Sequence, residues 1–261
     1  MTDYELYKVS SFGTSLTEPL FNELSEKENC VIFREDYGTA FLNGNKLFFL
    51  SVLPKCRNKG IGTRLLERCE EYVSEKGGEY IYVNGIFNGA PEESIGFFEK
   101  NGYEIKGNFV EMGMDVNGFC ADRTHAPDNT CYRFFDGDHS ELLQAVGEVD
   151  EEWAQYFTDD SKVFCGFKDG ELASFCIVDE DIHCLLSDGN NKVGSIGCVG
   201  TRPSFRKKGI GLYMVELATE YLAENGCDKS FIHCTHLEKW YGKLGYKTFL
   251  KYSAARKSVR R

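Results

Sequence analysis

The sequence lacks any long apolar run. Its longest one, Leu47 to Pro54, falls far short of the about 20 residues that a helix needs to cross a bilayer. The first residues, Met1 to Glu5, also lack the basic segment followed by an apolar one that marks a secretory signal. We therefore expect a cytoplasmic protein without a membrane partner.

Paired cysteines of the metal-binding kind are missing as well. The chain has 11 cysteines, but no two of them form a Cys-x-x-Cys pair, so a structural zinc site has little support. Most of them, including Cys165, Cys176 and Cys198, lie in apolar stretches that are typical of buried, reduced thiols. His233 and His236 stand three residues apart, a spacing that is usual for structural histidines. We expect no bound metal.

A basic excess is also absent. The chain has 41 acidic and 30 basic residues and a formal net charge of −11. Nucleic acids and anionic membrane surfaces attract cationic faces, so this charge argues against both as the main partner. It is compatible with a cationic substrate such as an amine, or with acidity that only aids solubility. The 261 residues, 42% of them hydrophobic, suffice for two domains with separate cores.

One segment occurs twice, at an offset of 149 residues. Pro54 to Gly62 reads PKCRNKGIG, and Pro203 to Gly211 reads PSFRKKGIG. In both copies an apolar strand pattern precedes the loop and a helical pattern follows it. Glycines let the backbone approach a ligand closely, and the first N–H groups of a helix are free to bind an anion. The sequence therefore predicts two domains, each with an anion-binding loop.

We divide the chain into a first domain at residues 1–116, a polar linker at 117–130 and a second domain at 131–261. The first half is expected to open with a strand at 5–12 and to end with one at 109–116. The second half repeats the order but, after a strand at 246–252, leaves only the basic segment 253–261, which we expect to be a solvated end. The sequence does not indicate what fills the corresponding sheet edge in the second half.

The two loops resemble motif A of the GNAT superfamily of N-acetyltransferases. That motif has the form Val-x-Pro-x-x-Arg-x-Lys-Gly-Ile-Gly. Val52 to Gly62 matches it, and Thr201 to Gly211 departs only by threonine in place of valine. The second signature of the family, an aromatic pair followed by glycine and an aromatic residue, occurs at Phe97 to Tyr103 and at Trp240 to Tyr246. Both signatures therefore occur twice and in the family's order.

The resemblance implies two α/β (α+β) domains, each a mixed, mostly antiparallel sheet with helices on both faces. It also implies acetyl-CoA, or another acyl-CoA, as co-substrate, with the pyrophosphate on the loop and the pantetheine arm along the preceding strand. The contacts implied in the first domain are Leu50, Ser51, Val52, Arg57, Asn58, Lys59, Gly60, Ile61, Gly62 and Thr63. Those implied in the second are Val199, Gly200, Thr201, Arg206, Lys207, Lys208, Gly209, Ile210, Gly211 and Leu212.

The resemblance further implies transfer of an acetyl group to a primary amine, of a small molecule or a protein, by direct attack. The departing thiolate needs an acid. In many family members this acid is a tyrosine four residues before the glycine of the second signature. That position holds Phe98 in the first domain and Tyr241 in the second. We therefore expect the second domain to be catalytic, with Tyr241 as the acid, and the first to be structural or to hold acyl-CoA without turnover.

The base that takes the amine proton is left open. Glu180, Asp181 and His183 follow a strand that we expect to line the second cleft, and His233 lies on the strand beside the cofactor. Cys234 stands where many relatives carry a cofactor-binding asparagine, a departure from the family's pattern. The alternative to an enzyme is a non-catalytic acyl-CoA-binding or scaffold protein, which the phenylalanine in the first domain favours.

Overall fold

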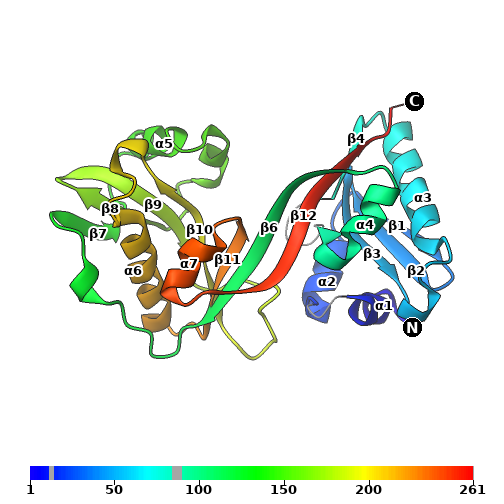
Figure 1. The fold of residues 1–261 in the computed structure, drawn as a ribbon, viewed down its shortest axis with the longest axis horizontal. Helices are drawn as coiled ribbons and strands as arrows, with labels where there is room; N and C mark the ends of the chain where they lie inside the picture. The colour runs from blue at the N-terminus through cyan, green and yellow to red at the C-terminus, as the bar shows by residue number, and fades with distance from the viewer. Residues whose placement is uncertain (12–14, 84–89, 261) are drawn as a thin grey trace. The chain divides into compact units, whose positions relative to one another are not determined.

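The structure is a computed structural model that describes residues 1–11, 15–83 and 90–260 (Figure 1). The chain forms two compact units, and neither is continuous in sequence. Unit 1 consists of Met1–Glu111, Cys234–His236 and Thr248–Arg261, and unit 2 of Met112–His233 and Leu237–Lys247. None of the helices in the described ranges is long and apolar enough to cross a membrane.

A mixed sheet with helices on both faces forms unit 1. Its strands lie in the order β1 (Cys30–Glu35), β2 (Gly38–Asn43), β3 (Lys46–Val52), β4 (Tyr80–Val83), β12 (Lys247–Ser258) and β6 (Glu104–Asp115), and β5 (Ala90–Pro91) pairs with β12. The helices are α1 (Asp3–Ser10), α2 (Glu18–Ser25), α3 (Ile61–Glu75) and α4 (Ile95–Lys100). Successive residues of β2 show the two faces, since Ala40 and Leu42 pack in the core under α3 while Phe41 contacts Phe21 of α2.

The predicted opening strand at 5–12 is wrong for the residues that the structure describes. Residues 3–10 form α1, whose start is fixed by a capping box in which Thr2 and Glu5 bond each other's backbone N–H groups. Tyr7 on this helix stacks on Phe21, with their ring centroids 5.0 Å apart. The cap and this aromatic packing favour the helix over a strand.

The C-terminal segment is not the solvated end that we expected. It forms β12, which pairs antiparallel with β4 from Ala255↔Val83 to Ser258↔Tyr80. Ala255 and Val259 are buried in the core of unit 1, and the ammonium of Lys257 lies 2.7 Å from the carboxylate of Glu70 on α3. The last residues of the chain therefore complete the sheet of the first unit.

A second mixed sheet forms unit 2. Its strands follow the order β6, β11 (Lys229–Thr235), β10 (Val193–Thr201), β9 (Glu171–Asp179), β8 (Val163–Lys168) and β7 (Thr130–Phe134). The helices are α5 (His139–Gly147), α6 (Ile210–Glu224) and α7 (Glu238–Tyr241). Helix α6 packs on β8, β9 and β10, and α5 packs on β9. A 3-10 helix at Glu151–Tyr156 follows α5.

The sheet edge that the sequence left open in the second half is filled by β6. The last residues of this strand, Met112–Asp115, belong to unit 2, where β6 is the neighbour of β11. The chain stays attached just beyond it, because the N–H of Val116 donates to the carbonyl of Asp228 at 3.0 Å. The second half of the sequence therefore supplies β12 to unit 1, and the first half supplies the end of β6 to unit 2.

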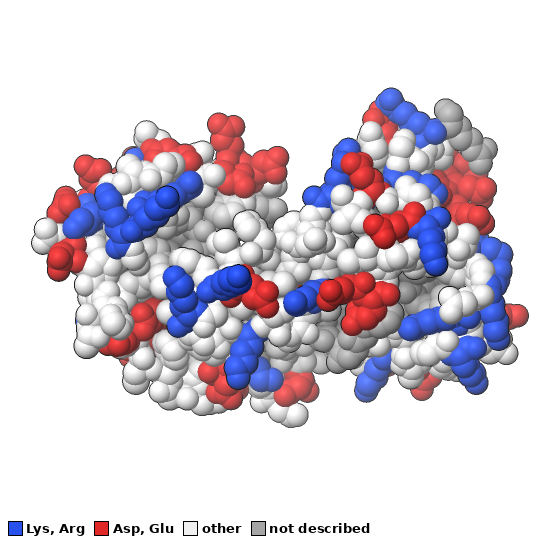
Figure 2. Space-filling model, viewed as in Figure 1, with Lys and Arg blue, Asp and Glu red and all other residues white. Residues whose placement is uncertain are grey.

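Acidic and basic side chains are interspersed on the face shown in Figure 2. The net charge of −11 is therefore not gathered into a patch of one sign on that face. This distribution is typical of a solvated surface, and it gives no direct indication of the acceptor.

Candidate active site

The loop of unit 2 presents free backbone donors at the start of α6. Lys207 and Gly209 both adopt left-handed φ angles, of 62° and 80°. The first helical hydrogen bond runs from the N–H of Tyr213 to the carbonyl of Gly209, at 3.0 Å. The N–H groups of the preceding helical residues, Ile210 to Leu212, therefore have no partner within the helix and point out of its positive end. Such an end is suited to a phosphate group.

A glycine lets this helix start directly against the strand that precedes the loop. A Cβ atom at Gly211 would lie 2.3 Å from the hydroxyl oxygen of Thr201, so no side chain fits there. The same virtual atom would lie 3.9 Å from the indole of Trp240. The loop, the end of β10 and the second signature thus meet at one place in unit 2.

The loop of unit 1 has the same backbone. Asn58 and Gly60 adopt φ angles of 60° and 78°, and the first helical bond runs from the N–H of Arg64 to the carbonyl of Gly60. A Cβ atom at Gly62 would lie 3.0 Å from the ring of Phe97. The two copies therefore differ in their side chains rather than in the path of the chain.

The predicted loop arginines are tied to the strands that precede them. The Nε of Arg206 donates to the carbonyl of Thr201 at 2.9 Å, and the Nε of Arg57 donates to the carbonyl of Val52 at 3.3 Å. Arg57 also donates to the carbonyl of Ser10 at 2.6 Å. These bonds hold each loop against its strand, while the neighbouring Lys207 and Lys208 are exposed. Contact of these residues with a cofactor stays a prediction.

Each loop follows a strand whose parallel neighbour diverges from it. In unit 2, β10 pairs with β11 only from Val193↔Lys229 to Ser195↔Phe231. In unit 1, the pairing of β3 with β4 is limited, within the described ranges, to Lys46↔Tyr82. The predicted contact residues 50–52 and 199–201 come after these pairs, where the two strands have separated. Each sheet therefore opens at the end that carries the loop.

A bulge adds to this opening in β10. The register with β9 shifts between Gly197 and Gly200, and Cys198 takes a left-handed φ of 47°. Cys198 and Val199 have no partner in the β9 ladder, so their backbone groups are available to an extended ligand chain. The strand β3 has its own irregularity, but its last four residues stay paired with β2.

Tyr241 lies at the end of α7, next to Trp240, whose indole faces the start of α6. Its side chain is only 4% exposed, and its ring packs edge-on against Trp240, with centroids 4.7 Å apart. Burial raises the pKa of Tyr241, and the nearby thiols of Cys176 and Cys198 act in the same direction. Its counterpart in unit 1, Phe98, is buried to the same degree against Tyr103 and has no hydroxyl.

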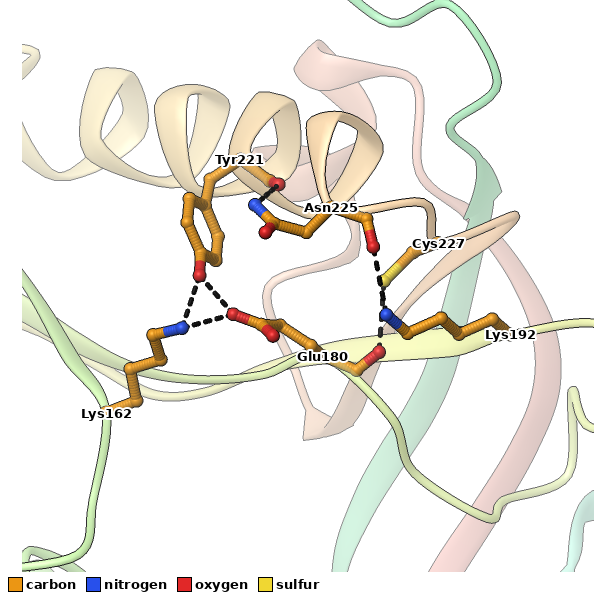
Figure 3. Close-up of polar contacts among 6 residues, drawn as sticks. All are labelled: Lys162, Glu180, Lys192, Tyr221, Asn225 and Cys227. Atoms are coloured by element: carbon orange, nitrogen blue, oxygen red, sulfur yellow. Dashed lines mark hydrogen bonds and ion pairs between the residues drawn. The ribbon is translucent and has the colours of Figure 1, made fainter.

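Glu180 does not lie at the open end of the sheet. It follows Asp179, which pairs with Ser195 at the end where β10 and β11 are still joined. Figure 3 shows its carboxylate bonded to the ammonium of Lys162 and the hydroxyl of Tyr221, near the C-terminal end of α6. The hydrogen bond from Lys162 holds the pKa of Glu180 below its usual value. This carboxylate belongs to an ion-pair network, and its expected place in the cleft is wrong.

The other candidate bases are exposed to solvent. Asp181 and His183 are exposed in the segment after β9, and His233 is exposed on β11, with its ring 6.0 Å from that of Phe231.

A buried carboxylate next to Cys234 was not predicted from the sequence. Glu111 on β6 is completely buried, and both of its oxygens accept from the N–H of Cys234, at 3.3 and 3.4 Å. Cys234 has a left-handed φ of 50°. The carboxylate thus supports a strained turn of β11 at the position where relatives carry an asparagine. No sequence signal marks this role, because Glu111 stands in an ordinary strand pattern.

Comparisons with known proteins agree with this architecture. The acetyltransferase (GNAT) family model matches residues 129–246, and a GNAT acetyltransferase domain model matches residues 24–105. No curated protein matches the sequence.

Several solved structures have a similar fold. The GCN5-related glucosamine N-acetyltransferase region of a fungal multi-domain GH3 beta-N-acetylglucosaminidase is 20% identical, with a TM-score of 0.69 over 87% of this chain. This chain covers 31% of that longer one. A GCN5-related N-acetyltransferase from Sphaerobacter thermophilus is 16% identical, with a TM-score of 0.69 over 94% of this chain and 86% of its own.

A tandem GNAT protein from the clavulanic acid biosynthesis pathway is 13% identical, with a TM-score of 0.59 over 86% of this chain and 80% of its own. Sequence identities this low support a similar fold and nothing further. Together with the two family matches, they confirm the fold and the family that the repeated motifs indicated. The chain belongs to the GNAT acetyltransferase family and carries two of its domains.

Proposed function

We propose that the protein is an acyl-CoA-dependent N-acyltransferase that transfers acetyl from acetyl-CoA to a primary amine, with the chemistry in unit 2. The observation that carries this proposal is Tyr241, a buried tyrosine whose ring packs on Trp240, the residue that faces the helix start, and that lies within electrostatic range of Cys198 on the β10 bulge. The equivalent place in unit 1 holds Phe98, which has no proton to donate.

The residues of unit 2 fit three requirements of the reaction: a pyrophosphate site, a site for the arm and an acid. The free N–H groups at Ile210 to Leu212 bind the pyrophosphate, and the unpaired backbone of the β10 bulge binds the arm that leads to the thioester. The neutral amine forms the new N–C bond as the C–S bond breaks. Tyr241 then gives its proton to the departing sulfur and is left as the phenolate until solvent restores it. The base that removes the amine proton is not assigned.

For unit 1 we propose a structural or acyl-CoA-holding role. Its loop has the backbone of the unit 2 loop, so binding is possible there without a general acid. A second candidate function for the whole chain is therefore a non-catalytic acyl-CoA sensor or scaffold. It predicts tight acyl-CoA binding without turnover of any amine, small or proteinaceous.

Calorimetric titration of acetyl-CoA, together with an assay of thiol release on a panel of primary amines, tests the proposal. Glutamate at the helix start repels the pyrophosphate, so we compare wild type with Gly209→Glu and Gly60→Glu. Both glycines have left-handed φ angles, so the two variants carry similar backbone strain. Gly209→Asn is the control for strain without charge, because asparagine tolerates this conformation.

We expect Gly209→Glu to reduce turnover to background, Gly60→Glu to retain it, and Gly209→Asn to lose little. Turnover that is lost only in Gly60→Glu would place the chemistry in unit 1. A wild-type protein that binds acetyl-CoA but releases no thiol with any amine would favour the sensor. The absence of binding would overturn both functions.

A further inference from the structure

An ion pair ties the end of α5 to the end of β10. Arg202, the first residue after β10, donates from Nε and Nη2 to the two carboxylate oxygens of Glu148, at 2.8 and 2.7 Å. Its Nη1 donates to the carbonyl of Leu172 on β9 at 2.9 Å. Glu148 is the C-terminal cap residue of α5. The helix α5 therefore ends beside the open end of β10.

The segment that follows α5 packs next to the β10 bulge. Phe157 lies edge-on to Phe175 of β9, with ring centroids 5.5 Å apart, and a Cβ atom at Gly200 would lie 2.3 Å from the ring of Phe175. The side chains of Trp153 and Cys198 pack on the same buried cluster that contains both phenylalanines. The segment between α5 and β8 thus covers the part of the sheet that contains the bulge.

Asp150 places a carboxylate in this segment. Its Oδ1 accepts from the N–H of Glu152 at 2.9 Å and so caps the 3-10 helix at Glu151–Tyr156. Within the described ranges, no other hydrogen bond or ion pair engages this half-buried carboxylate. Burial, and next the negative charge of Asp150, raise the pKa of the Cys198 thiol to about 11. The carboxylate is therefore within electrostatic range of the bulge.

Asp150 and Tyr241 approach the bulge from different elements. Cys198 lies within electrostatic range of Tyr241 as well, since its thiol is among the groups that, after burial, raise the pKa of that tyrosine. The bulge is where we place the arm that leads to the thioester. Attack by an amine needs an acceptor for the amine proton and a donor for the sulfur. A carboxylate and a phenol in range of one bulge residue are suited to these two tasks.

Two other aspartates of unit 2 show what a capping role alone looks like. Asp122 caps the 3-10 helix at Arg123–His125 through the N–H of Thr124, at 2.9 Å, and Asp138 caps α5 through the N–H of Ser140, at 2.8 Å. Both of these aspartates are exposed, whereas Asp150 is half-buried. Burial and the nearby bulge therefore distinguish Asp150 from aspartates that make the same bond.

We propose that Asp150 receives the amino group of the acceptor and takes its proton, a proposal that rests on the function proposed above. The nitrogen forms its bond to the thioester carbon, and the C–S bond breaks with its electron pair on the sulfur, which takes the proton of Tyr241. The nitrogen becomes positively charged as it attacks, and the carboxylate stabilises this charge. The proton then passes from the nitrogen to Asp150 and from there to solvent, which leaves a neutral amide.

The test separates the charge of Asp150 from its capping bond. Asp150→Asn removes the charge, while asparagine caps a helix about as well as aspartate. Asp150→Glu keeps the charge but weakens the cap, because glutamate is not among the residues that favour this position. Asp138→Asn makes the first change at the exposed cap of α5. The measurements are kcat/KM for the primary amine on which wild type releases thiol fastest, the Kd of acetyl-CoA, and the midpoint of urea unfolding.

We expect Asp150→Asn to lower kcat/KM for the amine by at least about 10²-fold, the lower end of the usual contribution of a general base. It should leave the Kd of acetyl-CoA and the urea midpoint as in wild type. Asp150→Glu should unfold at a lower urea concentration and yet retain more turnover than Asp150→Asn. Asp138→Asn should match wild type in all three measurements.

Two results would overturn the role of Asp150 and leave the proposed function standing. One is wild-type turnover of the amine by Asp150→Asn, which would make Asp150 a capping residue only. The other is turnover that follows the urea midpoint across the three variants, which would show a structural role. A wild type that releases no thiol with any amine would instead refute the proposed function and this inference together.

Discussion

The two copies of the strand–loop–helix unit share their backbone and differ in the groups around it. Gly60 and Gly209 have almost the same φ angles, and a second glycine in each copy allows a close approach to the neighbouring strand or ring. Unit 2 combines this loop with a tyrosine at the acid position, where unit 1 has Phe98, and its helix α6 holds the backbone of Ala121 and Asp122 through two glutamates. A binding loop can therefore be repeated without repeating the chemistry beside it.

The sheets of the two units also show that a sequence repeat is not a self-contained fold. The sheet of unit 1 is completed by the last residues of the chain, whereas that of unit 2 uses the end of β6. The chain passes from one unit to the other within β6, on either side of residues 234–236 and just after Lys247. Each half of the sequence therefore depends on a strand from the other.

The largest expected effect is the loss of stability of unit 1 when β12, the strand that the second half of the sequence supplies to it, is removed. A chain that ends at Lys247 loses β12 and three buried apolar side chains, those of Tyr252, Ala255 and Val259. Fully burying a large apolar side chain stabilises a fold by about 1.5–3 kcal/mol, so the loss is comparable with a net stability of about 5–15 kcal/mol. We expect unit 1 to unfold, which limited proteolysis and hydrogen exchange within residues 1–111 would detect.

The control for this truncation is a chain that ends at Val259, which retains β12 and its buried residues. It should match the full chain in both measurements. If residues 1–111 of the chain that ends at Lys247 were as protected from hydrogen exchange and proteolysis as in the full chain, unit 1 would fold without β12.

The acid position gives the next largest effect. Tyr241→Phe keeps the buried ring and removes the proton donor, so we expect kcat to fall by about 10²-fold with the Kd of acetyl-CoA unchanged. The reverse change in unit 1, Phe98→Tyr, should leave kcat unaltered. Because burial raises the pKa of Tyr241 above its usual 10.0, the wild-type rate should show no loss from its ionisation up to pH 10. Equal kcat values for wild type and Tyr241→Phe would refute the acid role.

The parts that the sequence predicted are those whose conformation is set locally. The loops follow from glycine and from residues that tolerate left-handed angles, and their helices follow from apolar spacing. The segment at 3–10 was within reach too, since Thr2 and Glu5 form a capping-box pattern that competes with the strand pattern.

The parts that the sequence missed depend on distant partners. Nothing in residues 248–258 indicates that they pair with β4 rather than remain in solvent, because strand pairing is set by the whole fold. Likewise Glu216 and Glu220 have counterparts in the first copy, Glu67 and Glu71, so the repeat alone did not predict that Glu216 and Glu220 bind the backbone of residues 121–122. The role of Glu111 depends in the same way on where β11 lies.

The tyrosines of the two second signatures offer a smaller, matched comparison. In unit 2 the hydroxyl of Tyr246 lies 2.9 Å from that of Thr219 and 2.7 Å from that of Ser230, all buried. In unit 1 the buried hydroxyl of Tyr103 has no partner at full hydrogen-bonding distance among the described residues and lies only within electrostatic range of the Glu70 carboxylate. Removing a buried partner costs about 1–3 kcal/mol, so Tyr246→Phe should destabilise the protein by this amount in urea unfolding. Tyr103→Phe should be neutral or stabilising, and equal losses would contradict the comparison.

The smallest effect is expected for Glu180→Gln, which tests whether this carboxylate acts as a base at the open end of the unit 2 sheet or only in the ion-pair network at the other end. A catalytic base at Glu180 predicts that Glu180→Gln lowers kcat by about 10²-fold or more. The ion-pair network predicts a change within about twofold and a loss of stability below about 1 kcal/mol, because Lys162 and Tyr221 are partly exposed. Since the folded-state pKa of Glu180 is lowered from 4.5, its contribution is present above that pH and disappears as pH falls through the lowered value. The unfolding free energies of wild type and Glu180→Gln should therefore differ at pH 7 and converge in acid. A difference that persists in acid would show that Glu180 contributes through packing rather than through its charge.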